Sequence, residues 1–86
     1  MENKVLVQII VPEISQTFDV YLPINKKIGN IIILLNQAIN ELSGNSFPIG
    51  HNKVLYNVAT KELYKSDILL FNTNIRNGSK LVLISL

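Results

Sequence analysis

The stretch that decides the fold is Asn74-Ile75-Arg76-Asn77-Gly78-Ser79-Lys80-Leu81-Val82-Leu83-Ile84, followed by Ser85-Leu86. Asn77-Gly78 is a strong turn signal, because asparagine and glycine accept the backbone conformations that tight turns require. Beyond the turn the chain is apolar. Successive side chains of a strand point to opposite faces, so we predict a final strand from Lys80 to Leu86.

Working back toward the N-terminus, two earlier segments alternate in the same way. In Lys4 to Val11, one predicted face carries Val5, Val7, Ile9 and Val11, and the other carries Leu6, Gln8 and Ile10. In the next segment Phe18, Val20 and Leu22 are predicted to face inward. Pro12 cannot donate to a strand ladder and therefore ends the first strand. The two segments predict an antiparallel hairpin with a short loop.

The segment after the hairpin has helical spacing. Its predicted buried stripe is Ile28, Ile31, Ile32, Leu35, Ala38, Ile39 and Leu42. Apolar residues three and four apart lie on one face of a helix. We predict Asn25 as the N-cap and Gly44 as the residue that ends the helix in a left-handed conformation. Ile33 is expected on the opposite face, away from the stripe.

The remaining segments predict a short strand at Lys53–Asn57, a lesser strand around residues 62–64, and a helical turn or tucked loop within residues 66–75. In the short strand we assign Val54 to the core and Leu55 to the outer face. The predicted order is β-β-α-β-β-β. This predicts one α+β domain over residues 1–86, with a single helix packed on one face of a mixed sheet of four or five strands.

Composition argues against several function classes. The chain has no cysteine, one histidine (His51) and a formal charge of only +2, with its basic residues dispersed. Its acidic residues show neither close pairing nor metal-ligand spacing, and no apolar run approaches the roughly 20 residues of a membrane span. We therefore expect no catalytic site, no cofactor or metal, no nucleic-acid binding and no direct membrane insertion.

Two stretches carry a family resemblance. Phe18-Asp19-Val20-Tyr21-Leu22, then five residues, then Ile28-Gly29-Asn30-Ile31 resembles the second strand and helix start of ubiquitin without a gap. The run from Leu70 to Leu81 resembles the ubiquitin-like signature before the last strand, with Thr73 at the usual tyrosine position. The chain is similar over its whole length to ubiquitin-like β-grasp proteins.

Within that superfamily the chain most resembles the YukD/EsaB group, small bacterial ubiquitin-like proteins associated with type VII secretion. The landmarks are Tyr21-Leu22-Pro23-Ile24 before the helix and Ile75-Arg76-Asn77-Gly78 before the last strand. The resemblance implies a cytoplasmic accessory or regulatory component of the secretion machine that acts through protein contacts. It offers no catalytic residue to carry over.

Further functions stay open on the sequence. A ubiquitin-like modifier or a sulfur carrier needs a slim C-terminal Gly-Gly tail, whereas this sequence closes on Ser85-Leu86. We therefore expect a non-conjugated binding domain. A generic β-grasp adaptor outside secretion also stays open, as does a homo-oligomer.

Apolar residues predicted to point outward mark the expected partner-binding surface. On the sheet face away from the helix these are Leu6, Ile10, Leu55, Val82, Ile84 and Leu86. Ile33, on the back of the helix, is a separate candidate. A contiguous exposed apolar patch often marks an interface, so we expect protein partners to bind one of these two surfaces.

Overall fold

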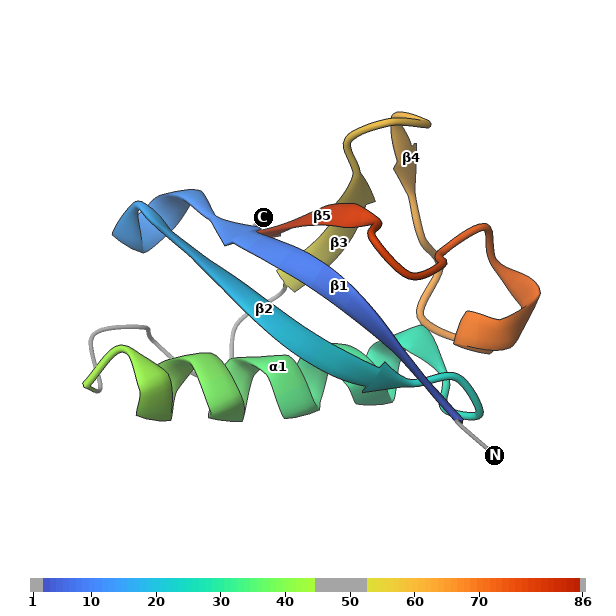
Figure 1. The fold of residues 1–86 in the computed structure, drawn as a ribbon, viewed down its shortest axis with the longest axis horizontal. Helices are drawn as coiled ribbons and strands as arrows, with labels where there is room; N and C mark the ends of the chain where they lie inside the picture. Colours follow the sequence, from blue (N-terminus) through green and yellow to red (C-terminus); the bar gives the residue numbers. More distant parts are fainter. Residues whose placement is uncertain (1–2, 45–52, 86) are drawn as a thin grey trace.

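The computed structural model describes residues 3–44 and 53–85. Within these two ranges, five strands, one α-helix and two 3-10 turns follow one another (Figure 1). Their bounds are β1 Lys4–Val11, η1 Pro12–Ile14, β2 Gln16–Pro23, α1 Ile28–Leu42, β3 Lys53–Asn57, β4 Glu62–Leu63, η2 Leu70–Asn72 and β5 Lys80–Ser85. The predicted α+β order is confirmed. His51 lies outside the described residues.

The strands form one mixed sheet in the order β2-β1-β5-β3-β4. β1 and β5 are parallel, while the β1–β2, β3–β5 and β3–β4 pairs are antiparallel. The last strand therefore lies in the middle of the sheet, between the first strand and the third. α1 crosses one face of this sheet, which Figure 1 shows beneath the strands.

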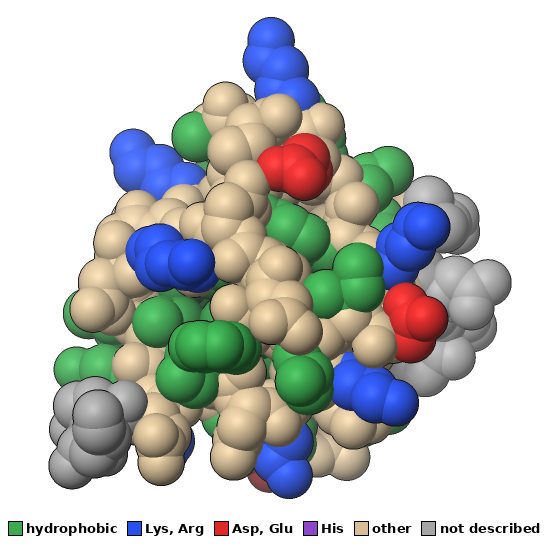
Figure 2. Space-filling view, turned by 90° about the vertical axis from the view of Figure 1, so that its right-hand side faces the viewer, with side chains coloured by type: hydrophobic (Ala, Val, Ile, Leu, Met, Phe, Trp, Pro, Cys, Tyr) green, Lys and Arg blue, Asp and Glu red, His purple; other side chains and the backbone are tan. Residues whose placement is uncertain are grey.

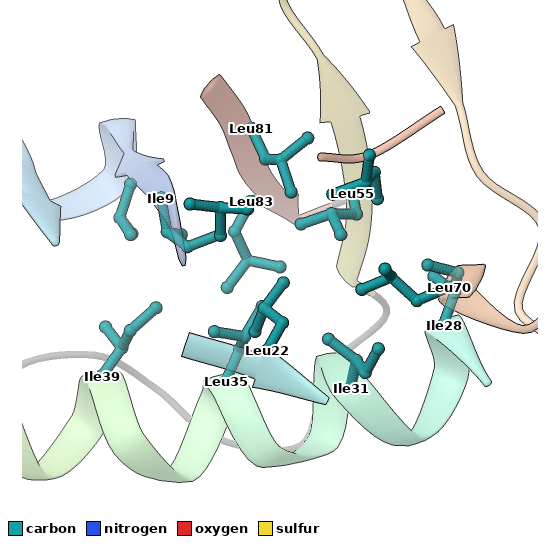
Figure 3. Packing of buried hydrophobic residues seen from close by; sticks show 13 residues of the cluster. Ile9, Leu22, Ile28, Ile31, Leu35, Ile39, Leu55, Leu70, Leu81 and Leu83 are labelled. Atoms are coloured by element: carbon teal, nitrogen blue, oxygen red, sulfur yellow. The ribbon is translucent and has the colours of Figure 1, made fainter. Parts of the chain in front are cut away.

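The core fills the space between α1 and the sheet (Figure 3). Its buried members are Val7, Ile9, Val11, Leu22, Ile28, Ile31, Leu35, Ile39, Leu55, Leu70, Ile75, Leu81 and Leu83. Fully burying one aliphatic side chain of this kind contributes about 1.5–3 kcal/mol. α1 contains several β-branched isoleucines, which are mediocre helix formers, so burial against the sheet stabilises it more than intrinsic propensity does.

The start of α1 differs from the prediction that Asn25 caps it. The N-cap is Lys27, and no side chain makes a capping bond. The loop before η2 takes that role, because the Ile68 carbonyl accepts from the Ile28 N–H at 2.9 Å and the Ser66 carbonyl accepts from the Gly29 N–H at 2.9 Å. The first helical amides are thus satisfied by a segment far away in sequence.

The end of α1 agrees with the prediction. Ser43 is the C-cap, and its N–H donates to the Ile39 carbonyl at 2.9 Å. Gly44 follows with φ +68°, a left-handed conformation that glycine adopts at little cost.

The two faces of β3 are reversed relative to the prediction. Leu55 is fully buried and belongs to the core, whereas Val54 lies on the opposite face of the strand. The inner face of β3 also carries Lys53 and Asn57, which are buried polar residues. Leu55 is therefore not available to a partner, and its assignment to the binding surface is wrong.

Candidate interaction surface

The sheet face opposite α1 carries a row of apolar side chains that runs across four strands. Its members are aligned by the strand register: Leu63 of β4 pairs with Tyr56 of β3, Tyr56 with Val82 of β5, and Val82 with Ile10 of β1. The neighbouring pair, Val54 and Ile84, extends the row by one step. We call these six residues the outer apolar row.

Every member of the outer apolar row is at least partly accessible to solvent. Leu63 and Ile84 are exposed, the latter by 37%, and the other four members are half-buried. Directly opposite side chains in a sheet lie about 4.5–5.5 Å apart between Cβ atoms, so this register makes the row a continuous strip. In the described part of the chain, the buried apolar residues of α1 and η2 belong to the core on the other side of the sheet.

The structure brings together three residues that the sequence predicted for this surface. Ile10, Val82 and Ile84 all belong to the outer apolar row. Leu6 lies on the same face and is 39% exposed, but it pairs with Tyr21 of β2. Polar residues separate Leu6 from the outer apolar row, because Gln8 lies between Leu6 and Ile10 and pairs with Lys80 on one side and Asp19 on the other.

The other predicted residues fall elsewhere. Ile33 is 56% exposed on α1, which covers the opposite face of the sheet, so it cannot contribute to the same surface. Leu86 lies outside the described residues. Sequence reasoning missed Tyr56, Val54 and Leu63. For Val54 and Tyr56 the sequence does contain a signal, since the two residues alternate along β3. That signal assigns them to the outer face only if the polar residues Lys53 and Asn57 are taken to face inward.

A shallow hollow surrounds Leu6 at the other end of this face. Its polar rim consists of Lys4, Gln8, Asp19, Asn77 and Lys80. Two hydrogen bonds join the backbone of Leu6 to the turn before β5. The Leu6 N–H donates to the Asn77 side-chain oxygen at 2.8 Å, and the Gly78 N–H donates to the Leu6 carbonyl at 2.8 Å. The hollow therefore combines the exposed apolar side chains of Leu6 and Tyr21 with a polar rim.

Within residues 3–44 and 53–85, histidine, cysteine and acidic side chains form no group of three that could hold a metal ion. In the same ranges, no helix combines the length and apolar character that a membrane crossing requires. The sheet face itself carries the outer apolar row, with polar side chains around Leu6 at its margin.

Comparison with solved structures shows which fold this architecture belongs to. No protein-family model and no curated protein matches the chain. The ubiquitin-like domain of the Mycobacterium tuberculosis type VII secretion protein EccD1 superposes with a TM-score of 0.76 at 17% identity, covering 98% of this chain and 100% of that domain. The chain has a ubiquitin-like β-grasp fold. The EccD5 ubiquitin-like domain of Mycobacterium xenopi agrees, with a TM-score of 0.71 at 17% identity, covering 99% of this chain and 97% of that one.

A third similar structure is a chain of the MycP5-free ESX-5 inner membrane complex. The superposition has a TM-score of 0.71 at 17% identity and covers 99% of this ubiquitin-like chain. The chain spans only 21% of that longer protein. At these identities the likeness establishes the fold, and a fold alone does not assign a function.

Proposed function

We propose that this chain is a non-enzymatic protein–protein interaction module of the YukD/EsaB type, acting in the cytoplasm as an accessory or regulatory component of a type VII secretion system. The sequence landmarks before α1 and before β5 support this proposal. It is also supported by the ubiquitin-like domains of EccD1 and EccD5, and by the chain of the ESX-5 inner membrane complex, among the similar structures.

The observation that carries the interaction role is the outer apolar row. Single exposed apolar residues are ordinary, but aligned ones on four adjacent strands form a contiguous patch, and such patches mark interaction surfaces. Tyr56 lies near the middle of the row, and tyrosine is enriched in interfaces because its ring adds apolar area while its hydroxyl stays solvated. We infer that the partner presents a complementary apolar strip to this face.

The test is binding to the cytoplasmic parts of the secretion apparatus, each presented separately. In the double variant Val82→Thr/Ile84→Thr each side chain stays β-branched, so the strand propensity of β5 is preserved while apolar contact is lost. We expect the dissociation constant to rise at least about tenfold, since each lost methyl contact at an interface is worth on the order of 1 kcal/mol.

The matched control is Ile33→Thr, the same chemical change on the back of α1. We expect it to leave the dissociation constant unchanged. Loss of binding in Ile33→Thr alone would show that the interface lies on α1 and not on the sheet. Tight binding by both variants would contradict the proposal. If the partner is a second copy of the chain, sedimentation velocity will show a dimer that the double variant loses.

A further inference from the structure

A second exposed apolar group lies at one end of the molecule, on the segment around η2. Phe71 is 65% exposed and Leu69 is 37% exposed, while Leu70 between them is fully buried in the core. The single buried residue holds the segment to the domain and leaves its two neighbours outside. None of the three belongs to the outer apolar row.

The segment is held firmly against the loop that leads into α1. The Leu70 N–H donates to the Lys26 carbonyl at 2.9 Å, and the Phe71 N–H donates to the Ile24 carbonyl at 2.9 Å. An isolated antiparallel bridge joins Lys27 to Leu69. Leu69 and Phe71 are therefore presented on a fixed backbone, so little conformational entropy is lost when they bind something.

The same hydrogen bonds place basic residues beside the two apolar ones. Lys26 and Lys27 are exposed and lie directly across the backbone pairing from Leu70 and Leu69. Lys65 is exposed and precedes the segment, and its carbonyl accepts from the Ile68 N–H at 3.4 Å. Asp67 is the single acidic residue between Lys65 and Phe71. We call Leu69, Phe71, Lys26, Lys27 and Lys65 the Phe71 corner.

The shape of this region narrows the choice of ligand. In Figure 1 η2 projects at the right-hand end of the long axis, beyond the sheet. Figure 2 views that end directly, with hydrophobic side chains grouped on it, several lysine and arginine side chains around them and acidic side chains at its margin. A projecting end of a domain can lie against a flat surface, whereas binding a peptide usually requires a groove that encloses it. The amides at the start of α1 are already bonded to the Ile68 and Ser66 carbonyls, so they do not provide an anion site.

We propose that the Phe71 corner docks the domain on an anionic lipid surface. Phe71 and Leu69 enter the boundary between headgroups and acyl chains, and Lys26, Lys27 and Lys65 contact the lipid phosphates. Apolar tips surrounded by lysines bind in this way, through buried apolar area together with attraction to anionic lipids. The contact is peripheral and leaves the outer apolar row free for a protein partner.

A single tryptophan tests the proposal, because the chain contains none. Phe71→Trp, at an exposed position, is titrated with phosphatidylcholine vesicles that contain or lack phosphatidylglycerol. We expect a blue shift of the tryptophan emission only with the anionic vesicles, and weaker binding at high salt because surface charge is screened. Ile33→Trp is the matched control and should show no shift.

Charge changes in the Phe71→Trp background separate lipid docking from a general charge effect. Lys26→Gln, Lys27→Gln and Lys65→Gln should each lower the partition coefficient about fivefold, the contribution of one lysine near an anionic membrane. Lys61→Gln, an exposed lysine in the β3–β4 turn, should change it less than twofold. Val82→Thr/Ile84→Thr should bind vesicles normally, so this proposal and the proposed function can fail independently.

Each of the following results would overturn the proposal. They are an absent blue shift, an equal shift in Ile33→Trp, or vesicle binding that is insensitive to all three lysine changes. A shift produced by soluble poly-glutamate but not by vesicles would also overturn it, and would indicate an acidic protein partner instead. Far-ultraviolet circular dichroism verifies that each variant is folded.

Discussion

At the scale of single residues, β3 shows how buried polar groups can mislead pattern analysis. The Lys53 side chain is only 1% exposed. Its ammonium donates to the Ser85 hydroxyl at 2.6 Å and lies 3.6 Å from a Glu13 carboxylate oxygen. The long aliphatic stem of a lysine can be buried when its charged end is paired. Lys53 therefore occupies an inward position that a simple hydrophobic pattern assigns to the outside.

Asn57, at the other end of β3, is buried for a similar reason. Its side-chain oxygen accepts from the Ala59 N–H at 2.9 Å, and its amide nitrogen donates to the Tyr64 hydroxyl at 2.8 Å. Tyr64 in turn donates to Asn74, which links the β3–β4 hairpin to the segment before β5. The inner face of β3 thus begins and ends with satisfied polar residues, and only Leu55 between them is apolar.

Paired alanine substitutions in β3 test this assignment. Leu55→Ala should lower the free energy of unfolding by about 2–5 kcal/mol, because it leaves a cavity in the core. Val54→Ala, on the half-buried outer face, should lower it by less than about 1.5 kcal/mol. Urea unfolding measures both. A larger loss for Val54→Ala than for Leu55→Ala would restore the opposite orientation of the strand.

At the scale of elements, the sequence predicted every strand, the helix and the turn region before the last strand. These predictions succeeded where a periodic pattern extended over many residues, as in β1 and in α1 from Ile28 to Leu42. They failed where a distant segment decides the outcome. The cap of α1 comes from the Ile68 and Ser66 carbonyls, and no local pattern around Asn25 could reveal them.

The residues of the sheet surface also divide into those that a local pattern predicts and those that depend on tertiary structure. Ile10, Val82 and Ile84 were predictable because β1 and β5 alternate or run apolar throughout. Leu6 was predicted for the right face, but its distance from the outer apolar row depends on the register of Gln8 with Lys80, which is a tertiary property. Tyr56 was missed because five residues are too few to fix the phase of a strand whose inner face is partly polar.

Gly29 connects α1 to the loop before η2 and offers a test of that junction. A Cβ atom at Gly29 would lie 3.1 Å from the Ser66 Cβ and 3.2 Å from the Ser66 carbonyl oxygen. That carbonyl also accepts the Gly29 N–H, so it cannot move away without lengthening the bond. We expect Gly29→Ala to lower the free energy of unfolding by about 1–2 kcal/mol, despite the better helix propensity of alanine.

The matched control is Asn30→Ala, the next residue along α1 and an exposed one. It should raise the free energy of unfolding by a few tenths of a kcal/mol, roughly the difference in helix propensity between asparagine and alanine. Thermal unfolding of both variants gives the comparison. Stabilisation by Gly29→Ala equal to that by Asn30→Ala would show that α1 and residue 66 are not in close contact.

At the scale of the whole molecule, the ubiquitin-like topology separates the two surfaces proposed to bind partners. The central position of β5 places Val82 and Ile84 in the middle of the sheet face, while α1 covers the other face (Figure 1) and carries Ile33 as an exposed residue. The η2 segment, which carries Phe71, lies at one end of the long axis (Figure 1). A domain arranged in this way can contact a lipid surface and a protein partner at the same time.

The most direct test of the proposed interaction role is a nuclear magnetic resonance titration of the isotope-labelled chain with the partner proposed for it, a cytoplasmic part of the secretion apparatus. We predict that the largest amide shift changes fall on the outer apolar row, at Ile10, Tyr56, Val82 and Ile84, and that Ile33 and its neighbours on α1 stay unchanged. Shift changes confined to α1, with the outer apolar row unaffected at saturation, would contradict this role for the sheet face.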